Sequence, residues 1–279
     1  MIRPASTVVL LRDGSDGVEV FMVRRHGKSG FMAGATVFPG GKVDAIDGPV
    51  EAPEGRAASA FFLAALRELH EEACVLFALD AAGDRVDDVQ AATLRAPLAA
   101  IRDGHRVDAA AHMALLDERG WRFDIDAVVP FARWITPEIE PRRFDTWFFA
   151  AAAPARQVAE IDGFEHTASS WMRPSEALAD HNGGGAIWLP PPTYHTLLRL
   201  AAIPGSAAQV VNALRSNGPI PSWMPHFIAD MPEGPVIALP DDPLHPEFDA
   251  ESVDADTEPR HRFVLNGGRF RYDRRGLDG

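Results

Sequence analysis

The stretch Arg67-Glu68-Leu69-His70-Glu71-Glu72 lies inside a segment, Arg56 to Leu79, that contains neither proline nor glycine. Apolar residues recur in this segment at spacings of three, four and three, at Leu66, Leu69, Ala73 and Leu76. This is the pattern of one buried helical face, so the segment predicts a helix. Its three glutamates stand at positions i, i+3 and i+4, and their carboxylates therefore project from one side of the helix.

Three carboxylates this close repel one another, and the helix would be more stable without them unless cations occupy the site. An acidic helix face is often merely solvated. The upstream turn Phe38-Pro39-Gly40-Gly41 favours a metal site instead, because its carbonyls can supply a ligand and its glycines permit close approach of a phosphate. Oxygen ligands of this kind suit Mg²⁺ or Mn²⁺, which also bind substrate phosphates. We therefore predict a site for a diphosphate.

The glycine turn and the acidic helix together resemble the Nudix box, the signature of a family of hydrolases. The box runs glycine, five residues, glutamate, seven residues, then Arg-Glu-aliphatic-any-Glu-Glu-any-Gly-aliphatic. The matching residues are Gly41 at its start and Arg67, Glu68, Leu69, Glu71, Glu72 and Val75 at its end.

The chain departs from the box at two points. The stretch between Gly41 and Arg67 is about a dozen residues longer than the box allows, and Ser59 stands where the helical spacing requires the first glutamate. The candidates to replace that glutamate are Asp44, Asp47 and Glu54. Cys74 replaces the late glycine, which affects the predicted end of the helix more than the predicted metal site.

An expanded box resembles the subgroup that includes an animal coenzyme A diphosphatase. Further matches to this subgroup, within residues 3 to 202, are Arg3-Pro4-Ala5, the stretch from Arg24-Arg25 to Phe31-Met32-Ala33-Gly34, Trp134-Ile135-Thr136-Pro137, Pro141 to Thr146, Trp171-x-x-Pro and Pro191-Pro192-Thr193. The resemblance implies an α/β protein, an α/β/α sandwich around a mixed β-sheet. We expect a Nudix hydrolase domain over residues 1–204, with a helical insertion at about 85–120. A C-terminal extension over 205–279, with an acidic tract and a terminal hairpin, follows it.

The residue pattern is compatible with this order of elements. Apolar or β-branched runs predict strands at Ser6–Leu11, Val18–Val23, Ala35–Phe38, Ala127–Ile135, Phe144–Ala151, around Trp171 and on both sides of Asn266-Gly267-Gly268. The Ala-rich segment Asp87 to Arg119 predicts helices, with a break near Asp103-Gly104. Prolines in the first turn predict helix starts at Pro174 and Pro191.

The resemblance implies that metal-activated water attacks one phosphorus of a nucleoside diphosphate derivative. Carried over by position, the metal ligands would be Glu68, Glu71, Glu72 and the Gly41 carbonyl. The catalytic residues would be Glu68, Glu71 and Arg67, with Glu68 orienting or deprotonating the water. Arg67 would hold a carboxylate in place or act only as a tether.

Further contacts are left open by the sequence. An additional acid from a distant loop could be Glu138, Glu140 or Glu165. Basic residues near predicted strand ends are candidate phosphate contacts or plain ion-pair partners: Arg24, Arg25, Lys28, Arg142 and Arg143. Gly40 completes the predicted substrate-binding set. Trp134 and Trp147 either stack on a base or belong to the core, whereas His70 points away from the glutamates and is not expected to be a ligand.

Composition limits the partners. A net charge of −13 argues against nucleic-acid binding, which needs clustered Lys and Arg. The single cysteine favours a reducing cytoplasm, and an N-terminal apolar run of five residues is too short to insert in a membrane. Eight acids and no Lys or Arg occur from Asp241 to Glu258. The Arg-rich terminal hairpin suggests a possible homodimer.

We therefore expect an enzyme acting on a small nucleotide substrate, with coenzyme A or acyl-coenzyme A as the first hypothesis. A nucleotide sugar, NADH or ADP-ribose is the alternative substrate. A Nudix-fold module that binds a nucleotide without cleaving it is the alternative class, and the repulsion among the three glutamates argues against it.

Overall fold

The computed structural model describes residues 1–27, 32–104, 106–161, 163, 165–215, 218–249, 260–266 and 268–275. Eight strands of this part form one sheet, in the order β11-β2-β1-β10-β9-β12, with β3 beside β2 and β4 beside β1. They are β1 (Ile2–Gly14), β2 (Gly17–Arg25), β3 (Thr36–Val37), β4 (Gly40–Lys42), β9 (Val129–Ile135), β10 (Arg143–Ala152), β11 (His166–Met172) and β12 (Ser222–Trp223). The sheet is mixed, because β1 runs parallel to β10 and antiparallel to β2.

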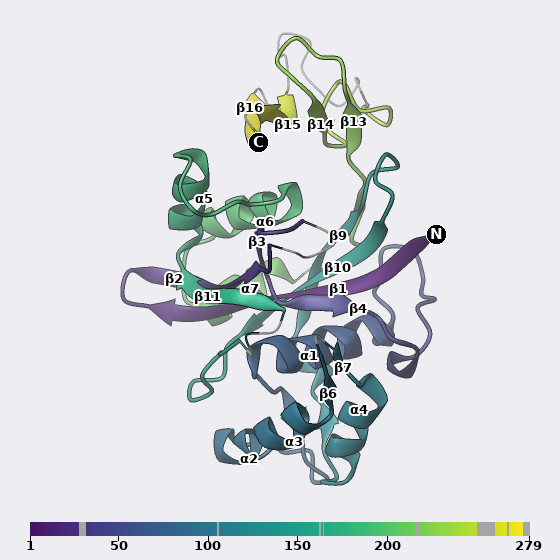
Figure 1. Ribbon diagram of the computed structural model, residues 1–279, viewed down its shortest axis with the longest axis vertical. Helices are drawn as coiled ribbons and strands as arrows, with labels where there is room; N and C mark the ends of the chain where they lie inside the picture. Colours follow the sequence, from purple (N-terminus) through teal and green to yellow (C-terminus); the bar gives the residue numbers. More distant parts are fainter. Residues whose placement is uncertain are drawn as a thin grey trace.

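Helices cover both faces of this sheet (Figure 1). Helix α1 (Ser59–Ala73) lies on one face, and α5 (Pro174–Asn182), α6 (Pro191–Ala201) and α7 (Ala207–Leu214) lie on the other. In β1, Val8 and Leu10 pack on the α1 side while Val9 and Leu11 pack on the opposite side. A strand buried on both faces is apolar throughout. The predicted α/β/α sandwich around a mixed sheet is confirmed.

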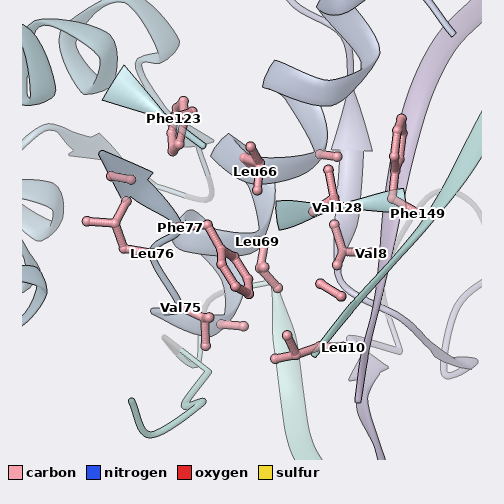
Figure 2. Packing of buried hydrophobic residues seen from close by; sticks show 14 of the residues in the cluster. Val8, Leu10, Leu66, Leu69, Val75, Leu76, Phe77, Phe123, Val128 and Phe149 are labelled. Carbon is pink, nitrogen blue, oxygen red and sulfur yellow. The ribbon is translucent and has the colours of Figure 1, made fainter. Parts of the chain in front are cut away.

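Leu66 and Leu69 of α1 point into the core beside Val8, Leu10 and Phe149 (Figure 2). The helix is shorter than the proline-free and glycine-free segment that predicted it. It ends because Cys74 adopts the left-handed conformation, with φ of 56°, and its N–H donates to the His70 carbonyl. The conformation that the late box glycine would supply is therefore preserved by a cysteine.

The predicted helical insertion packs against α1 at the end of the molecule opposite the C-terminal sheet (Figure 1). Its elements are α2 (Asp88–Ala92), α3 (Arg95–Ala100), β6 (Arg102–Asp103), β7 (Arg106–Val107) and α4 (Ala109–Asp117). The predicted break near Asp103 is the small β6–β7 hairpin. Strands β5 (Ala78–Leu79) and β8 (Arg122–Phe123) pair at its base, and the short helices η1 (Ala45–Asp47) and η2 (Ile125–Ala127) complete this side.

A second sheet contains β13 (His226–Ile228), β14 (Val236–Ala238), β15 (Arg260–Asn266) and β16 (Arg269–Arg275). The predicted terminal hairpin is confirmed as β15–β16. It packs on its own chain, since Phe263 contacts Tyr194 of α6 at a ring-centroid distance of 5.6 Å. The homodimer thus stays a prediction, and so does the division of the chain at residues 204 and 205.

Residues 250–258 of the acidic tract lie outside the described part of the chain. One of its first acids has a structural role. Asp242 is fully buried and accepts from both Nε and Nη2 of Arg262, at 2.7 and 2.8 Å. This paired fork ties the loop after β14 to β15.

No helix in the described ranges is long and apolar enough to cross a membrane.

Candidate active site

A buried guanidinium organises the acidic face of α1. Arg67 donates from Nε to Asp47 Oδ1 at 3.0 Å and from Nη2 to Asp47 Oδ2 at 2.9 Å. Its Nη2 also donates to the Lys42 carbonyl at 3.0 Å. Of the three candidates to replace the missing box glutamate, Asp47 is the one that binds Arg67. Asp44 instead caps η1. Five residues separate Gly41 from Asp47, the spacing that the box has between its glycine and its first glutamate, so the extra residues lie between Asp47 and α1.

The remaining nitrogen of Arg67 holds two of the glutamates. Nη1 donates to Glu68 Oε1 at 3.0 Å and to Glu71 Oε1 at 3.1 Å. Glu72 is held separately, because its Oε2 accepts from the Gly40 N–H at 2.8 Å. The helix and the glycine turn are therefore joined directly through charged groups.

The glycine turn presses against the Glu68 carboxylate. A Cβ at Gly41 would stand 2.3 Å from the carboxyl carbon of Glu68, and a Cβ at Gly40 would stand 2.3 Å from the Ser6 carbonyl oxygen. Neither position has room for a side chain. Glycine is required here because the turn approaches β1 and α1 so closely.

Burial disfavours charge on all three glutamates. It raises the pKa of Glu68 to about 7, against the attraction of Arg67 and with added repulsion from Glu71. Burial also raises the pKa of Glu71 to about 7. The pKa of Glu72 lies well above its usual value because of burial and the charges of Glu68 and Glu165. A divalent cation among these oxygens would offset that repulsion.

The donor set fits a cation that takes few protein ligands. Within the described residues, no group of three or more His, Cys, Asp or Glu side chains is placed to hold a metal ion as the side chains stand. Arg67 and the Gly40 N–H bind the carboxylate oxygens instead. Mg²⁺ and similar ions keep several waters and bind through one or two carboxylates together with substrate phosphates. The buried carboxylates of α1 can supply these ligands, and the glycine turn beside them leaves room for the substrate phosphates.

Two buried histidines form a hydrogen-bonded chain that ends at Glu71. His112 Nδ1 lies 3.0 Å from Glu71 Oε1, and its Nε2 lies 2.8 Å from His70 Nδ1. Burial lowers the pKa of both imidazoles, that of His112 to about 3. A neutral His112 that donates from Nδ1 must accept at Nε2, so His70 donates to it. His70 thus reaches Glu71 through α4, a contact that no spacing in the sequence indicates.

A cavity of about 680 Å³ opens beside the acidic face of α1. Glu68, Glu71, Arg67, Gly40 and Gly41 line it, together with Glu165 from the loop before β11. Of the other two loop acids, Glu140 lines the cavity, whereas Glu138 is exposed and lies 3.7 Å from Arg143 Nη1.

The candidate phosphate contacts divide into two groups. Arg25 lines the cavity, and so do Lys42 and Arg106, which the sequence did not single out. Arg24, Arg142 and Arg143 are not among the residues that line it; Arg143 donates from Nε to the Thr136 carbonyl at 2.9 Å. Lys28 lies outside the described residues.

The two tryptophans have different surroundings. Trp147 is buried in the core on the α1 side. Trp134 lines the cavity and is stacked on Trp223 at a centroid distance of 5.5 Å.

Known proteins are similar to this chain in fold and in sequence. The family model described as the NUDT19 Nudix domain matches residues 53–200. The crystal structure of a Nudix hydrolase from Alicyclobacillus acidocaldarius is 31% identical, covers 78% of this chain and 99% of its own, and gives a TM-score of 0.65. The acyl-coenzyme A diphosphatase NUDT19 of Xenopus laevis is 28% identical, over 96% of this chain and 83% of that protein. The human protein of the same name is also 28% identical, over 84% and 74% of the respective chains.

The sandwich, the glycine turn and the acidic helix define a Nudix hydrolase, a class of enzyme that generally uses divalent metal ions. The chain belongs to the NUDT19 Nudix family, whose model matches more than half of its length.

Proposed function

We propose that this enzyme hydrolyses the diphosphate of coenzyme A or an acyl-coenzyme A, with Mg²⁺ or Mn²⁺ as the cation. The products would be a 4′-phosphopantetheine and adenosine 3′,5′-bisphosphate. The observation that carries the proposal is the single guanidinium of Arg67, which holds both Glu68 and Glu71 beside Gly41 at the wall of one cavity. The names of the Xenopus and human relatives support the choice of substrate.

We assign the cation to the group of oxygens formed by the carboxylates of Glu68, Glu71 and Glu72 and the carbonyl of Gly41, of which one or two carboxylates would bind it directly. The cation would lower the pKa of a bound water and offset the charge of the diphosphate. Glu68, which lies directly against Gly41, would accept the proton of the attacking water. The water oxygen bonds to one phosphorus, and the bridging oxygen leaves with the electron pair of the broken bond. Arg67 keeps Glu68 and Glu71 in position throughout.

The substrate phosphates would meet Arg25, Lys42 and the glycine turn. The Nε of Arg25 is buried and makes no hydrogen bond within the described residues, so it has a donor to offer to a phosphate oxygen. Lys42 directly follows the turn and also lines the cavity. Glu165 is the loop acid that we assign to the site, because its charge acts on both Glu68 and Glu72.

A substrate panel tests this proposal. Coenzyme A, octanoyl-coenzyme A, NADH, ADP-ribose and a nucleotide sugar would be incubated with Mg²⁺ or Mn²⁺, with and without EDTA, and the products separated by chromatography. We expect metal-dependent cleavage, with coenzyme A derivatives preferred. Glu71→Gln should lose activity, whereas Glu118→Gln, an exposed position outside the cavity, should retain it.

Two other results of the substrate panel would change the proposal. Preferred cleavage of NADH, ADP-ribose or the nucleotide sugar would replace the proposed substrate and leave the metal site in place. Metal and nucleotide binding without cleavage of any compound would favour the non-catalytic binding module. The cytoplasmic location and the exclusion of nucleic acid stay predictions.

A further inference from the structure

The cavity is built from two chemically different sets of residues. Around the acids of α1 it is lined by charged side chains, including Arg25, Lys42 and Arg106. Three residues of the C-terminal sheet, Phe227, Ile237 and Phe270, line it as well, and all are apolar. Helix α1 packs on one face of the main sheet, whereas the C-terminal sheet lies on the side of the other face, where it contacts α5 and α6 (Figure 1). The charged and the apolar linings therefore lie apart.

The residues of the apolar lining share one face of the second sheet. Phe227 is directly opposite Ile237, Ile237 is opposite Phe263, and Phe263 is opposite Tyr272. Directly opposed residues share one face of a sheet, so these side chains form a row across all four strands. Phe270, two residues before Tyr272, projects to the same side.

The members of this row differ in how far they are buried. Phe263 is fully buried, and its ring and that of Tyr272 contact Tyr194 of α6 at 5.6 and 5.5 Å. Phe227, Ile237 and Phe270 are only half-buried and face the cavity. Large apolar side chains left partly uncovered in a concave site are typical of ligand contacts.

The proposed substrates, like the cavity, have one charged part and one apolar part. On one side of the diphosphate is a charged nucleotide phosphate, and on the other is an uncharged pantetheine arm that carries the acyl chain as a thioester. A cavity of about 680 Å³ lies within the range of about 300–1,000 Å³ that accommodates a sizeable organic ligand. The lining by three basic residues fits the nucleotide arm, and the apolar wall fits the acyl arm.

We propose that Phe227, Ile237 and Phe270 of the C-terminal sheet form the subsite for the acyl chain of an acyl-coenzyme A substrate and set the preferred chain length. This inference rests on the proposed function. It assigns to the C-terminal extension a specificity role that the acidic helix and the glycine turn do not have.

Two measurements test the subsite. The first is kcat/KM for free, acetyl-, butyryl-, hexanoyl- and octanoyl-coenzyme A. Burial of methylene groups should raise kcat/KM by about threefold or more for every two carbons, below the full transfer value of about fourfold per methylene. The second is calorimetric binding of S-acetyl- and S-octanoyl-pantetheine, which lack the diphosphate and need neither metal nor cleavage. The octanoyl compound should bind more tightly.

Variants test whether the dependence on acyl-chain length comes from Phe227 and Ile237. Phe227→Ala should lower kcat/KM about tenfold more for octanoyl-coenzyme A than for free coenzyme A, the equivalent of about 1.4 kcal/mol. Ile237→Trp should fill the subsite and shift the preference towards the acetyl compound. Val264→Ala, on the other face of β15 and outside the cavity lining, is the matched control, and it should keep the wild-type chain-length profile.

The outcomes separate the subsite from the reaction. A kcat/KM independent of chain length, equal binding of the two pantetheine thioesters, or variants that affect free and octanoyl-coenzyme A alike would overturn the subsite while leaving the diphosphatase intact. Tighter binding of S-octanoyl-pantetheine, lost in Ile237→Trp, without cleavage of any coenzyme A derivative would uphold the subsite and refute the proposed function.

Discussion

The bond between Arg67 and Asp47 is the innermost support of the acidic site. Arg67 and Asp47 are both almost fully buried, and their fork is bidentate. Without Asp47, the buried Arg67 would keep only Glu68 and Glu71 as ionic partners, and breaking a buried ion pair costs about 3–5 kcal/mol. We therefore predict that Asp47→Ala lowers the free energy of unfolding by about that amount, as measured by urea denaturation.

Asp44 provides the control for this prediction. It caps η1 three residues earlier and is not a partner of the Arg67 guanidinium in the bonds described above. Asp44→Ala should cost about 1 kcal/mol, the usual effect of a lost cap. Equal losses of unfolding free energy in the two variants would show that the Arg67–Asp47 pair stabilises the fold no more than an ordinary helix cap.

The contact from His112 to Glu71 predicts an effect on metal affinity. Groups that orient a metal ligand typically change affinity about 10–100-fold when lost. We expect His112→Leu to weaken Mn²⁺ binding by about that factor, measured by calorimetry. His112→Asn, which can place an N–H near the position of Nδ1, should recover most of the loss.

Leu116→Ala controls for packing, because Leu116 is buried on the same helix α4 without belonging to the acid cluster. If His112→Leu and Leu116→Ala weaken Mn²⁺ binding equally, His112 has only a structural role.

At the scale of the element, the crowded acids of α1 predict how metal-free stability depends on pH. A carboxyl whose pKa is raised by folding stabilises the fold below its unfolded pKa, and this contribution is lost as pH rises through the folded pKa. For Glu71 the pKa rises from 4.5 to about 7, so the loss falls between these values. In EDTA, the difference in unfolding free energy between the wild type and Glu71→Gln should fall from pH 5 to pH 8.

Added Mg²⁺ should therefore raise the melting temperature more at pH 8 than at pH 5. A stability difference between wild type and Glu71→Gln that is constant with pH, or a larger effect of Mg²⁺ at pH 5, would contradict this account of the acid cluster.

The end of α1 carries a conformational cost. Cys74 has a φ of 56°, a region that costs residues with a Cβ about 1–2 kcal/mol and is least tolerated by β-branched residues. We predict that Cys74→Gly is more stable than Cys74→Val by at least about 1 kcal/mol, as measured by urea denaturation. A valine variant as stable as the glycine variant would show that the helix does not depend on this left-handed ending.

The sequence predicted α1 and its acidic face correctly because helical periodicity and like-charge crowding are local properties. It left Asp44, Asp47 and Glu54 undecided, because helical spacing was counted back from Arg67 across the inserted residues. Counting forward from Gly41 reaches Asp47. The support from His112 could not be predicted, since it depends on how the insertion folds back onto α1, 41 residues away from Glu71.

At the scale of the whole molecule, the C-terminal extension completes the cavity as well as the core. The sequence predicted its terminal hairpin from the turn at Asn266 but could not show which surface the hairpin would cover. Phe227, Ile237 and Phe270 of the second sheet face the cavity together only because β13 to β16 pair in one register. Long-range register of this kind is set by packing and is not written in any local pattern.

The buried pair of Asp242 and Arg262 fixes this extension. Asp242→Ala removes the two-bond fork from the buried Arg262, whose other ionic partner is Glu233 at 3.7 Å, and should lower the free energy of unfolding by about 3–5 kcal/mol. The exposed Glu247 supplies the control, and Glu247→Ala should change stability by less than about 0.5 kcal/mol. Equal stability of the two variants in thermal denaturation would mean that the extension is held by other contacts.

The central claim is that the acids of α1 perform metal-dependent hydrolysis of a coenzyme A diphosphate. The most direct measurement is kcat for coenzyme A with saturating Mg²⁺, in the wild type, Glu68→Gln and the exposed control Glu118→Gln. We predict a loss of about 10²–10⁴-fold in Glu68→Gln, the usual contribution of a group that takes a proton in the transition state, and no loss in the control. Unchanged turnover in Glu68→Gln, or turnover by the wild type in EDTA, would contradict the account.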